Sequence, residues 1–153
     1  MAFTADYEIL SGRLDEALRQ APHAAPDLFA KIIGCVCTRV SLLDRSGKAG
    51  RVDRLLQAGA WADAAMALIE LELPAWTLRR AVYEDGEWLC SLSRQPNLPL
   101  ELDDTVDARH EKLPLAILRA FIEARSRSES MKTSGVPLLA RDHAGTLCCD
   151  NFA

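Results

Sequence analysis

A change of hydrophobic period in the middle of the chain is the sequence feature that most constrains the fold. Before Pro74, apolar residues recur at spacings of three and four, which is typical of amphipathic helices. From 76 to 93 the period becomes two, and Asp85-Gly86 supplies a dipeptide that favours tight turns between antiparallel strands. The sequence therefore predicts helices followed by one antiparallel β-hairpin, with strands 76–83 and 87–93.

Helical patterns account for most of the chain before the hairpin. The segment 4–22 is expected to form one amphipathic helix, and 26–47 a second. The centre of the second segment, 32–43, is rich in β-branched residues and would also suit a buried strand. A third helical pattern covers 50–73, and Gly59 can divide it into two pieces.

A long C-terminal helix is expected over 105–126, after an extended connection that contains two prolines. Its apolar stripe includes Val106, His110 and Ile117, and Pro114 either kinks the helix or opens its second half. The polar, aperiodic residues 126–153 predict a linker and a tail, which could include a small terminal hairpin. The fold class is thus α+β and mainly α, with three or four helices in a single globular domain over 1–125.

Composition narrows the classes of protein that this chain can belong to. Hydrophobic residues make up 49% and charged residues 26% of the 153, which is typical of a soluble domain with a packed core. The net charge of −4 argues against nucleic acid as a partner, because phosphate binding needs a basic surface. The longest apolar stretch, 60–73, is interrupted by acidic residues and is too short to cross a membrane.

Cysteine usage and codon-related composition suggest where the protein is found. Five cysteines are an odd number, and without a recognisable export signal they are better interpreted as free thiols in the cytoplasm than as disulfides. Abundant arginine and alanine are typical of a GC-rich bacterial genome. A bacterial cytoplasmic protein is therefore expected.

The first candidate site is on the hairpin and depends on the register of its strands. A two-residue turn at Asp85 and Gly86 would place Glu84 opposite Glu87 and put the apolar residues of the two strands on opposite faces. A three-residue turn over 84–86 instead predicts that Arg80 faces Cys90 on the apolar face. Arg80 would then lower the pKa of Cys90 or bind an anionic ligand, unless it reaches the sheet edge and Cys90 is a small core residue.

A second candidate is His110, on the apolar stripe of the expected last helix. If that helix covers the hairpin, His110 approaches Arg80 and Cys90 and gives a Cys–His pair beside an arginine. The alternative is a core or boundary histidine that is hydrogen-bonded to the backbone.

Sulfur and basic side chains supply the remaining candidates. His143 with Cys148 and Cys149 could hold zinc or act in redox chemistry, although adjacent cysteines do not match the usual Cys-x-x-Cys spacing of structural zinc sites. A basic cluster near the end of the last helix could face a phosphate or an acidic partner, or simply be solvated; it contains Arg119, Arg125, Arg127 and Lys132.

The functional expectation is a non-catalytic cytoplasmic module that binds a protein or a small anionic ligand. The sequence contains no Gly-x-Ser-x-Gly, His-Glu-x-x-His, phosphate-loop or dinucleotide motif. The alternative is a thiol-based or metal-dependent activity of Cys90 with His110, or of the terminal cysteine pair. Because an isolated hairpin is marginally stable, a homodimer formed through the hairpin edge is also expected as one way to complete the sheet.

Overall fold

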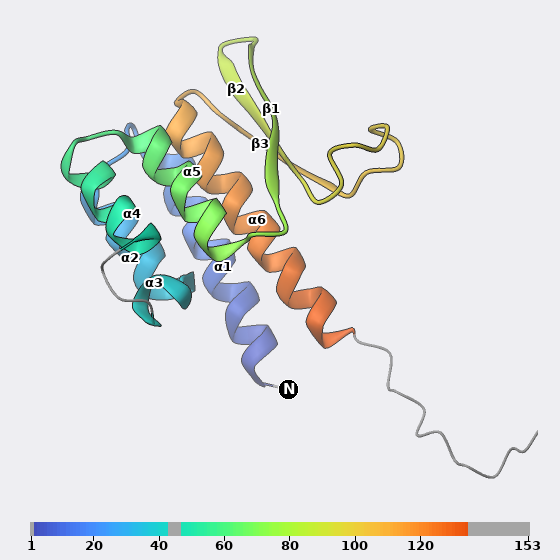
Figure 1. The fold of residues 1–153 in the computed structure, drawn as a ribbon, viewed down its shortest axis with the longest axis horizontal. Coiled ribbons are helices and arrows are strands. Elements are labelled where there is room, and N and C mark those ends of the chain that lie inside the picture. The colour runs from blue at the N-terminus through green and yellow to red at the C-terminus, as the bar shows by residue number, and fades with distance from the viewer. Residues whose placement is uncertain (1, 43–46, 135–153) are drawn as a thin grey trace, which may run out of the picture.

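The computed structural model describes residues 2–42 and 47–134 (Figure 1). The predicted class is confirmed: the fold is α+β, mainly helical, with a hairpin and a long C-terminal helix. None of the described helices is long and apolar enough to cross a membrane. The elements in chain order are α1 (Ala2–Gln20), α2 (Pro26–Val36), α3 (Arg39–Leu42), α4 (Lys48–Gln57), α5 (Trp61–Glu72), β1 (Thr77–Glu84), β2 (Glu87–Ser93), β3 (Thr105–His110) and α6 (Leu113–Thr133).

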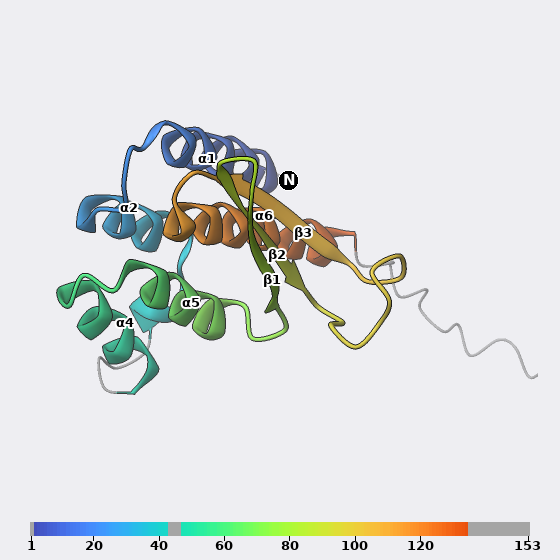
Figure 2. The ribbon, with the colours of Figure 1, turned by 90° about the horizontal axis from the view of Figure 1, so that it is seen from above.

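Helix α6 is the centre of the fold. It contacts α1, α5, β2 and β3, and Figure 2 shows α1 on one side of it and α4 and α5 on the other. A helix that is apolar on all sides is expected to be surrounded by protein, and the middle of α6 has this pattern. Its buried apolar residues are Leu115, Ala116, Ile117, Leu118, Ala120, Phe121, Ile122 and Ala124.

The two helices α4 and α5 are separated at Gly59, as the sequence allowed. Gly59 has a φ of 70°, which glycine adopts without strain. The N–H of Ala60 donates to the carbonyl of Leu55 at 2.9 Å, and the N–H of Gly59 donates to that of Leu56 at 3.1 Å. These two bonds form a Schellman motif, which satisfies the last carbonyls of α4 and starts α5 in a new direction.

The described part of the β-branched segment, residues 32–42, is neither a strand nor one continuous helix. Helix α2 ends at Val36, and Cys37 has an extended backbone with a φ of −97°. The single turn α3 then begins at Arg39. The strand alternative is therefore wrong for the described part of this segment.

The sheet has three antiparallel strands in the order β1-β2-β3, and the third strand comes from a segment that was predicted to be helical. The expected helix over 105–126 is wrong at its start, because 105–110 forms β3 and α6 begins only at Leu113. Lys112, at the helix N-cap, has an extended backbone, and Pro114 lies in the first turn. Proline therefore suits the start of this helix, because the first turn does not need its missing N–H and its fixed φ is already helical. The helix continues to Thr133, so residues 126–133 are helical rather than linker.

The hairpin is confirmed, but its predicted register is wrong over most of its length. Asp85 and Gly86 both have positive φ, at 53° and 84°, and form a two-residue turn with Glu84 opposite Glu87. The register shifts between Leu78 and Arg80, so that Arg79 is the extra residue of a β-bulge. The sequence argument placed this extra residue in the turn instead of in the strand. Only the pairs beyond the bulge, Thr77 with Ser93 and Leu78 with Leu92, have the predicted partners.

Candidate functional site

The predicted pairing of Arg80 with Cys90 does not occur. Arg80 is exposed and lies opposite Ser91, so it is on the other face of the sheet from Cys90, which pairs with Ala81 and Ala108. Cys90 is fully buried, and burial raises the pKa of its thiol to about 11. A thiol in this environment is protonated near neutral pH and is a poor nucleophile.

His110 shares the helix-facing side of the sheet with Cys90 and Ala108. It ends strand β3 opposite Trp88 and is 8% exposed. Its Nδ1 accepts a hydrogen bond from the backbone N–H of Lys112 at 2.9 Å. This is the backbone-bonded boundary histidine that the sequence analysis gave as the alternative, and the bond fixes the turn between β3 and α6.

The proposed metal and redox residues His143, Cys148 and Cys149 lie outside the described residues, so the zinc and terminal-thiol interpretations stay predictions. Within 2–42 and 47–134, no group of three or more potential ligands could hold a metal ion.

A buried ion pair, Glu72 with Arg125, lies where α5, α6 and the α2–α3 connection meet. The carboxylate of Glu72 is completely buried, and the side chain of Arg125 is 11% exposed. Nη1 of Arg125 is 3.8 Å from Oε2 of Glu72, and Nη2 is 3.6 Å from Oε1 of Glu129 on the next turn of α6. The guanidinium is therefore neutralised by carboxylates from two helices.

Glu72 also caps the short helix α3. Its Oε1 accepts the N–H of Val40 at 2.8 Å, and its Oε2 accepts the N–H of Thr38 at 3.2 Å. A buried carboxylate is tolerated when its oxygens are hydrogen-bonded and its charge is paired. This arrangement holds α3 against the end of α5 and explains why the chain turns sharply after Cys37.

A cavity of about 810 Å³ opens beside Arg125, between α1, the end of α2 and the C-terminal half of α6. Its lining is rich in hydroxyl groups: Tyr7, Thr38, Ser126, Ser130 and Ser134. The Tyr7 hydroxyl and Nε of Arg125 are both buried and lack a hydrogen-bond partner among the described residues. Burial raises the pKa of Tyr7 to about 12, although the nearby Arg125 charge opposes this rise. Tyr7 and Arg125 thus both line the cavity, and each has one buried polar atom that the described residues leave without a well-formed hydrogen bond.

A second cavity, of about 420 Å³, adjoins the first and shares Thr38, Arg125 and Lys132 with it. We call the two cavities together the Arg125 cleft. The lining of the second cavity is basic, since it includes Arg39, Arg94, Arg125 and Lys132 against one acidic residue, Glu72.

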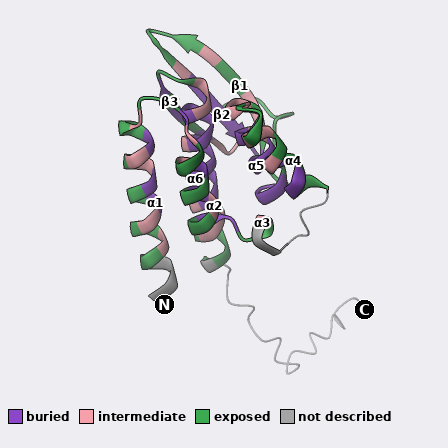
Figure 3. Cartoon of the chain, turned by 90° about the vertical axis from the view of Figure 1, so that its left-hand side faces the viewer, coloured by how far each residue is buried: buried purple, intermediate pink, exposed green. Residues whose placement is uncertain are grey.

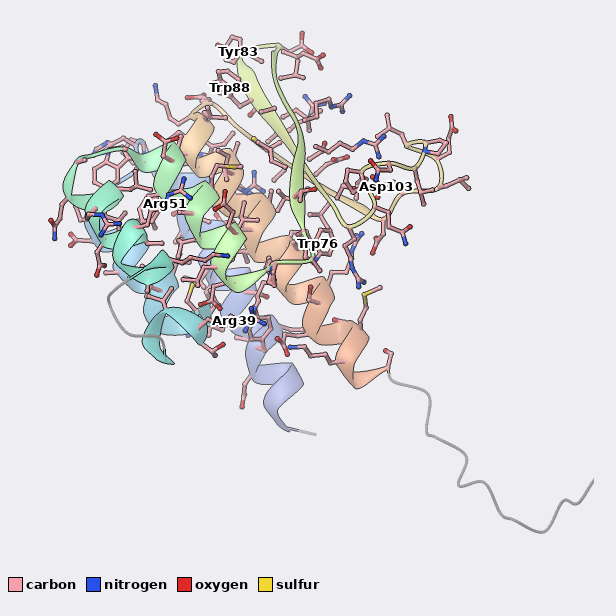
Figure 4. The ribbon with its side chains drawn as sticks, in the orientation of Figure 1. Arg39, Arg51, Trp76, Tyr83, Trp88 and Asp103 are labelled. Atoms are coloured by element: carbon pink, nitrogen blue, oxygen red, sulfur yellow. The ribbon has the colours of Figure 1, made fainter. Side chains whose placement is uncertain are left out.

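Two arginines of the second cavity have no carboxylate partner in the described ranges. Nη1 of Arg39 makes only a 3.4 Å contact with the carbonyl of Leu71. The guanidinium of Arg94 lies 5.9 Å from the ring centroid of Trp76, and its Nη1 is 2.9 Å from Sδ of Met131. Figure 4 shows Arg39 and Trp76 on the same side of the molecule, near the end of α5.

Trp76 forms a fixed wall of the second cavity. Its side chain is almost fully buried, and its indole N–H donates to Oγ of Ser128 at 2.9 Å. Ser128 in turn donates to the carbonyl of Ala124. The hydrogen-bonded ring provides a rigid surface on which the guanidinium of Arg94 is held.

Cys37 lies close to the cleft but is not an activated thiol. It is 5% exposed, and burial raises its pKa to about 12, with the negative charge of Glu72 acting in the same direction. The Cys37 thiol therefore remains protonated at neutral pH.

Sequence reasoning named Arg125 and Lys132 only as members of a basic cluster, and it did not connect them with Tyr7, Arg39 or Glu72. Glu72 was the residue in the sequence that could have indicated this site, because it is acidic and lies at the end of the apolar stripe of α5. Its burial could have been suspected, but its partners come from two other segments, residues 38–40 and α6, and share no sequence motif.

Comparisons of this chain with protein-family models, with curated proteins and with solved structures find no match. The Arg125 cleft is therefore defined only by the geometry of this chain.

Proposed function

We propose that this protein is a non-catalytic cytoplasmic module that binds a small oxyanion ligand, a carboxylate or a phosphate, in the Arg125 cleft. The observation that carries the proposal is the pair of buried donors without acceptors, the Tyr7 hydroxyl and Nε of Arg125. A buried donor that has no partner costs about 1–3 kcal/mol, so structures seldom keep two in one place without an acceptor. An oxygen-rich ligand supplies acceptors for both.

Charge supports an anion rather than a neutral ligand. Arg39 and Arg94 line the second cavity and lack carboxylate partners in the described ranges, so both are available to pair with an anion. Glu8 and Glu129 line the first cavity, so the excess of positive charge is in the second. Guanidinium groups bind carboxylates and phosphates through charge-assisted hydrogen bonds. The overall negative charge of the protein does not oppose this, because the cleft has a locally basic wall.

The size of the cleft suits a small molecule. Ligand sites typically have volumes of about 300–1,000 Å³, and the larger cavity, of about 810 Å³, falls within this range. Ordered water would satisfy the same two donors, and a binding experiment distinguishes water from a ligand.

The test is calorimetric titration of the full-length protein with inorganic phosphate, pyrophosphate and citrate as probes. We expect at least one probe to bind saturably and to raise the midpoint of thermal unfolding with increasing concentration, because a ligand that binds only the folded state stabilises it. Arg39→Gln combined with Arg94→Gln should weaken binding by about tenfold or more, since each lost charge-assisted bond contributes about 1.5 kcal/mol.

Arg51→Gln is the matched control. Arg51 is on α4, away from the cleft (Figure 4), in an exposed ion pair with Glu70 at 3.0 Å. Its replacement removes one positive charge but no cleft residue, so affinity should not change. The proposal fails if none of the three probes binds saturably, or if the Arg51 variant loses as much affinity as the double variant.

A further inference from the structure

The two edges of the sheet differ in how they are covered. On β3, the edge strand next to α6, the side chains of Arg119 and Arg127 donate to the backbone carbonyls of Arg109 and Thr105. These bonds occupy acceptors that an incoming strand would need. An uncovered edge is a template for pairing with another chain, and natural proteins usually cover or interrupt it.

The other edge, on β1, is not covered by any described residue between Arg80 and Glu84. Glu84 and Glu87 flank the two-residue turn and are hydrogen-bonded to each other, so the backbone N–H and C=O of Glu84 point toward β2. Because the direction alternates along an antiparallel strand, the backbone groups of Val82 and Arg80 also point toward β2. The N–H and C=O groups of Ala81 and Tyr83 therefore point away from the sheet. Both residues are exposed, Tyr83 by 58%, and β1 has the exposed and intermediate colours in Figure 3 while β2 is largely buried.

The charges along this open segment form no ion pairs with the described residues. Arg80 is exposed, lies opposite Ser91, and forms no ion pair with any described residue. Glu84 lies opposite Glu87, and like charges that face each other across strands are destabilising. Arg80 and Glu84 are four residues apart in one strand, so their side chains lie on the same face.

We propose that a second copy of this chain pairs with β1 in an antiparallel arrangement centred on Val82. In this register Val82 faces its symmetry mate, and Ala81 and Tyr83 exchange the free backbone hydrogen bonds. Arg80 then lies opposite Glu84 of the second copy, twice by symmetry. The segment is complementary to itself in both its backbone and its charge, as a two-fold interface requires.

The bulge at Arg79 limits the extent of this pairing. It interrupts the regular edge on one side, and the turn at Asp85 and Gly86 ends it on the other. The interface is thus confined to residues 80–84, and we expect a weak dimer with a dissociation constant in the micromolar range. This inference does not depend on ligand binding in the Arg125 cleft.

The test is the sedimentation mass of the full-length protein as a function of concentration. The wild type should approach the dimer mass at high micromolar concentration. Arg80→Glu and Glu84→Arg should each weaken the dimer by about tenfold or more, because each places two like-charge pairs across the interface. The combined Arg80→Glu and Glu84→Arg variant should recover most of the affinity, since it exchanges the charges and restores both pairs.

Two further variants separate this interface from other effects. Ala81→Pro removes an edge N–H that faces solvent in the monomer, so it should abolish dimer formation while unfolding remains cooperative. Arg109→Glu, on the covered edge strand β3, should leave the dimer unchanged. The proposal is overturned if the wild type stays monomeric at high micromolar concentration. It is also overturned if the combined variant does not recover the dimer affinity that each single charge reversal loses.

Discussion

Glu72 and Arg125 form a buried ion pair, with Nη1 of Arg125 3.8 Å from Oε2 of Glu72, at the point where α3, α5 and α6 meet. The same carboxylate caps α3 through two backbone N–H groups. Arg125 differs from Glu72 because one of its polar atoms, Nε, has no hydrogen-bond partner among the described residues. Both carboxylate oxygens of Glu72 therefore have partners within the fold, whereas Arg125 retains one N–H donor that can bind a ligand.

Removing Glu72 should destabilise the protein strongly. Glu72→Ala leaves the positive charge of Arg125 only partly neutralised and removes the cap of α3. Breaking a buried ion pair in this way lowers the free energy of unfolding by about 3–5 kcal/mol. Denaturant unfolding measures the change. Glu70→Ala, which breaks the exposed pair with Arg51, is the control and should cost at most about 1 kcal/mol. Equal losses for the two variants would show that the Glu72 pair is not a central support of the fold.

Tyr7→Phe should separate a role in binding from a role in folding. Because the Tyr7 hydroxyl has no hydrogen-bond partner among the described residues, its removal should leave the free energy of unfolding unchanged or raise it slightly. The same change should weaken oxyanion binding, because one donor of the cleft is lost. Denaturant unfolding and calorimetric titration give the two readouts. A loss of stability larger than about 1 kcal/mol would indicate a structural hydrogen bond instead.

Asp103 should make stability depend on pH in the acid range. Burial acts to raise the pKa of this carboxyl, but hydrogen bonds from Ser93, Arg79 and the backbone of Gln95 outweigh it and lower the pKa from its ordinary value. A lowered pKa means that the stabilisation is present above the unfolded-state pKa and is lost as pH falls through the folded-state pKa. Asp103→Asn should flatten the decrease in unfolding free energy between about pH 5 and pH 2. An unchanged slope would contradict this assignment.

The described cysteines should differ in reactivity according to burial. Cys35 is exposed, whereas Cys37 and Cys90 are buried and have pKa values raised to about 12 and about 11. Alkylation of the native protein, followed by peptide mass spectrometry, should label Cys35 first. Cys37 and Cys90 should be labelled only under unfolding conditions. Rapid labelling of Cys90 in the native protein would instead support a thiol-based activity of this residue.

The helices and the hairpin could be predicted because their signals are local. Apolar spacing defined the helices, and Asp85-Gly86 marked the turn. Segment 105–110 was predicted to be helical because Val106 and His110 fit a helical stripe, although Val106, Ala108 and His110 fit a strand equally well. Pro114 was the local signal that should have decided between them, because it favours a helix start.

The register and the site could not be predicted because they depend on contacts between distant segments. The register argument required one buried face, but Leu89, Cys90 and Ser91 are all buried, so both faces of β2 are covered. That burial removes the alternation on which the argument relied. Asp103 pairs with Arg79, the extra residue of the bulge, and no spacing in the sequence indicates that pairing. The Arg125 cleft likewise combines segments that no spacing in the sequence relates.

The most direct test of the central claim is to observe the side-chain Nε–H group of Arg125 during a titration. Buried arginine Nε–H groups give resolved nitrogen-edited NMR signals, and Arg125→Lys assigns the Arg125 signal by its loss. We expect this signal to shift and saturate as phosphate, pyrophosphate or citrate is added, in step with the calorimetric binding curve. An Arg125 signal that stays fixed at saturating probe, while the signals of exposed arginines move, would rule out oxyanion binding at Arg125.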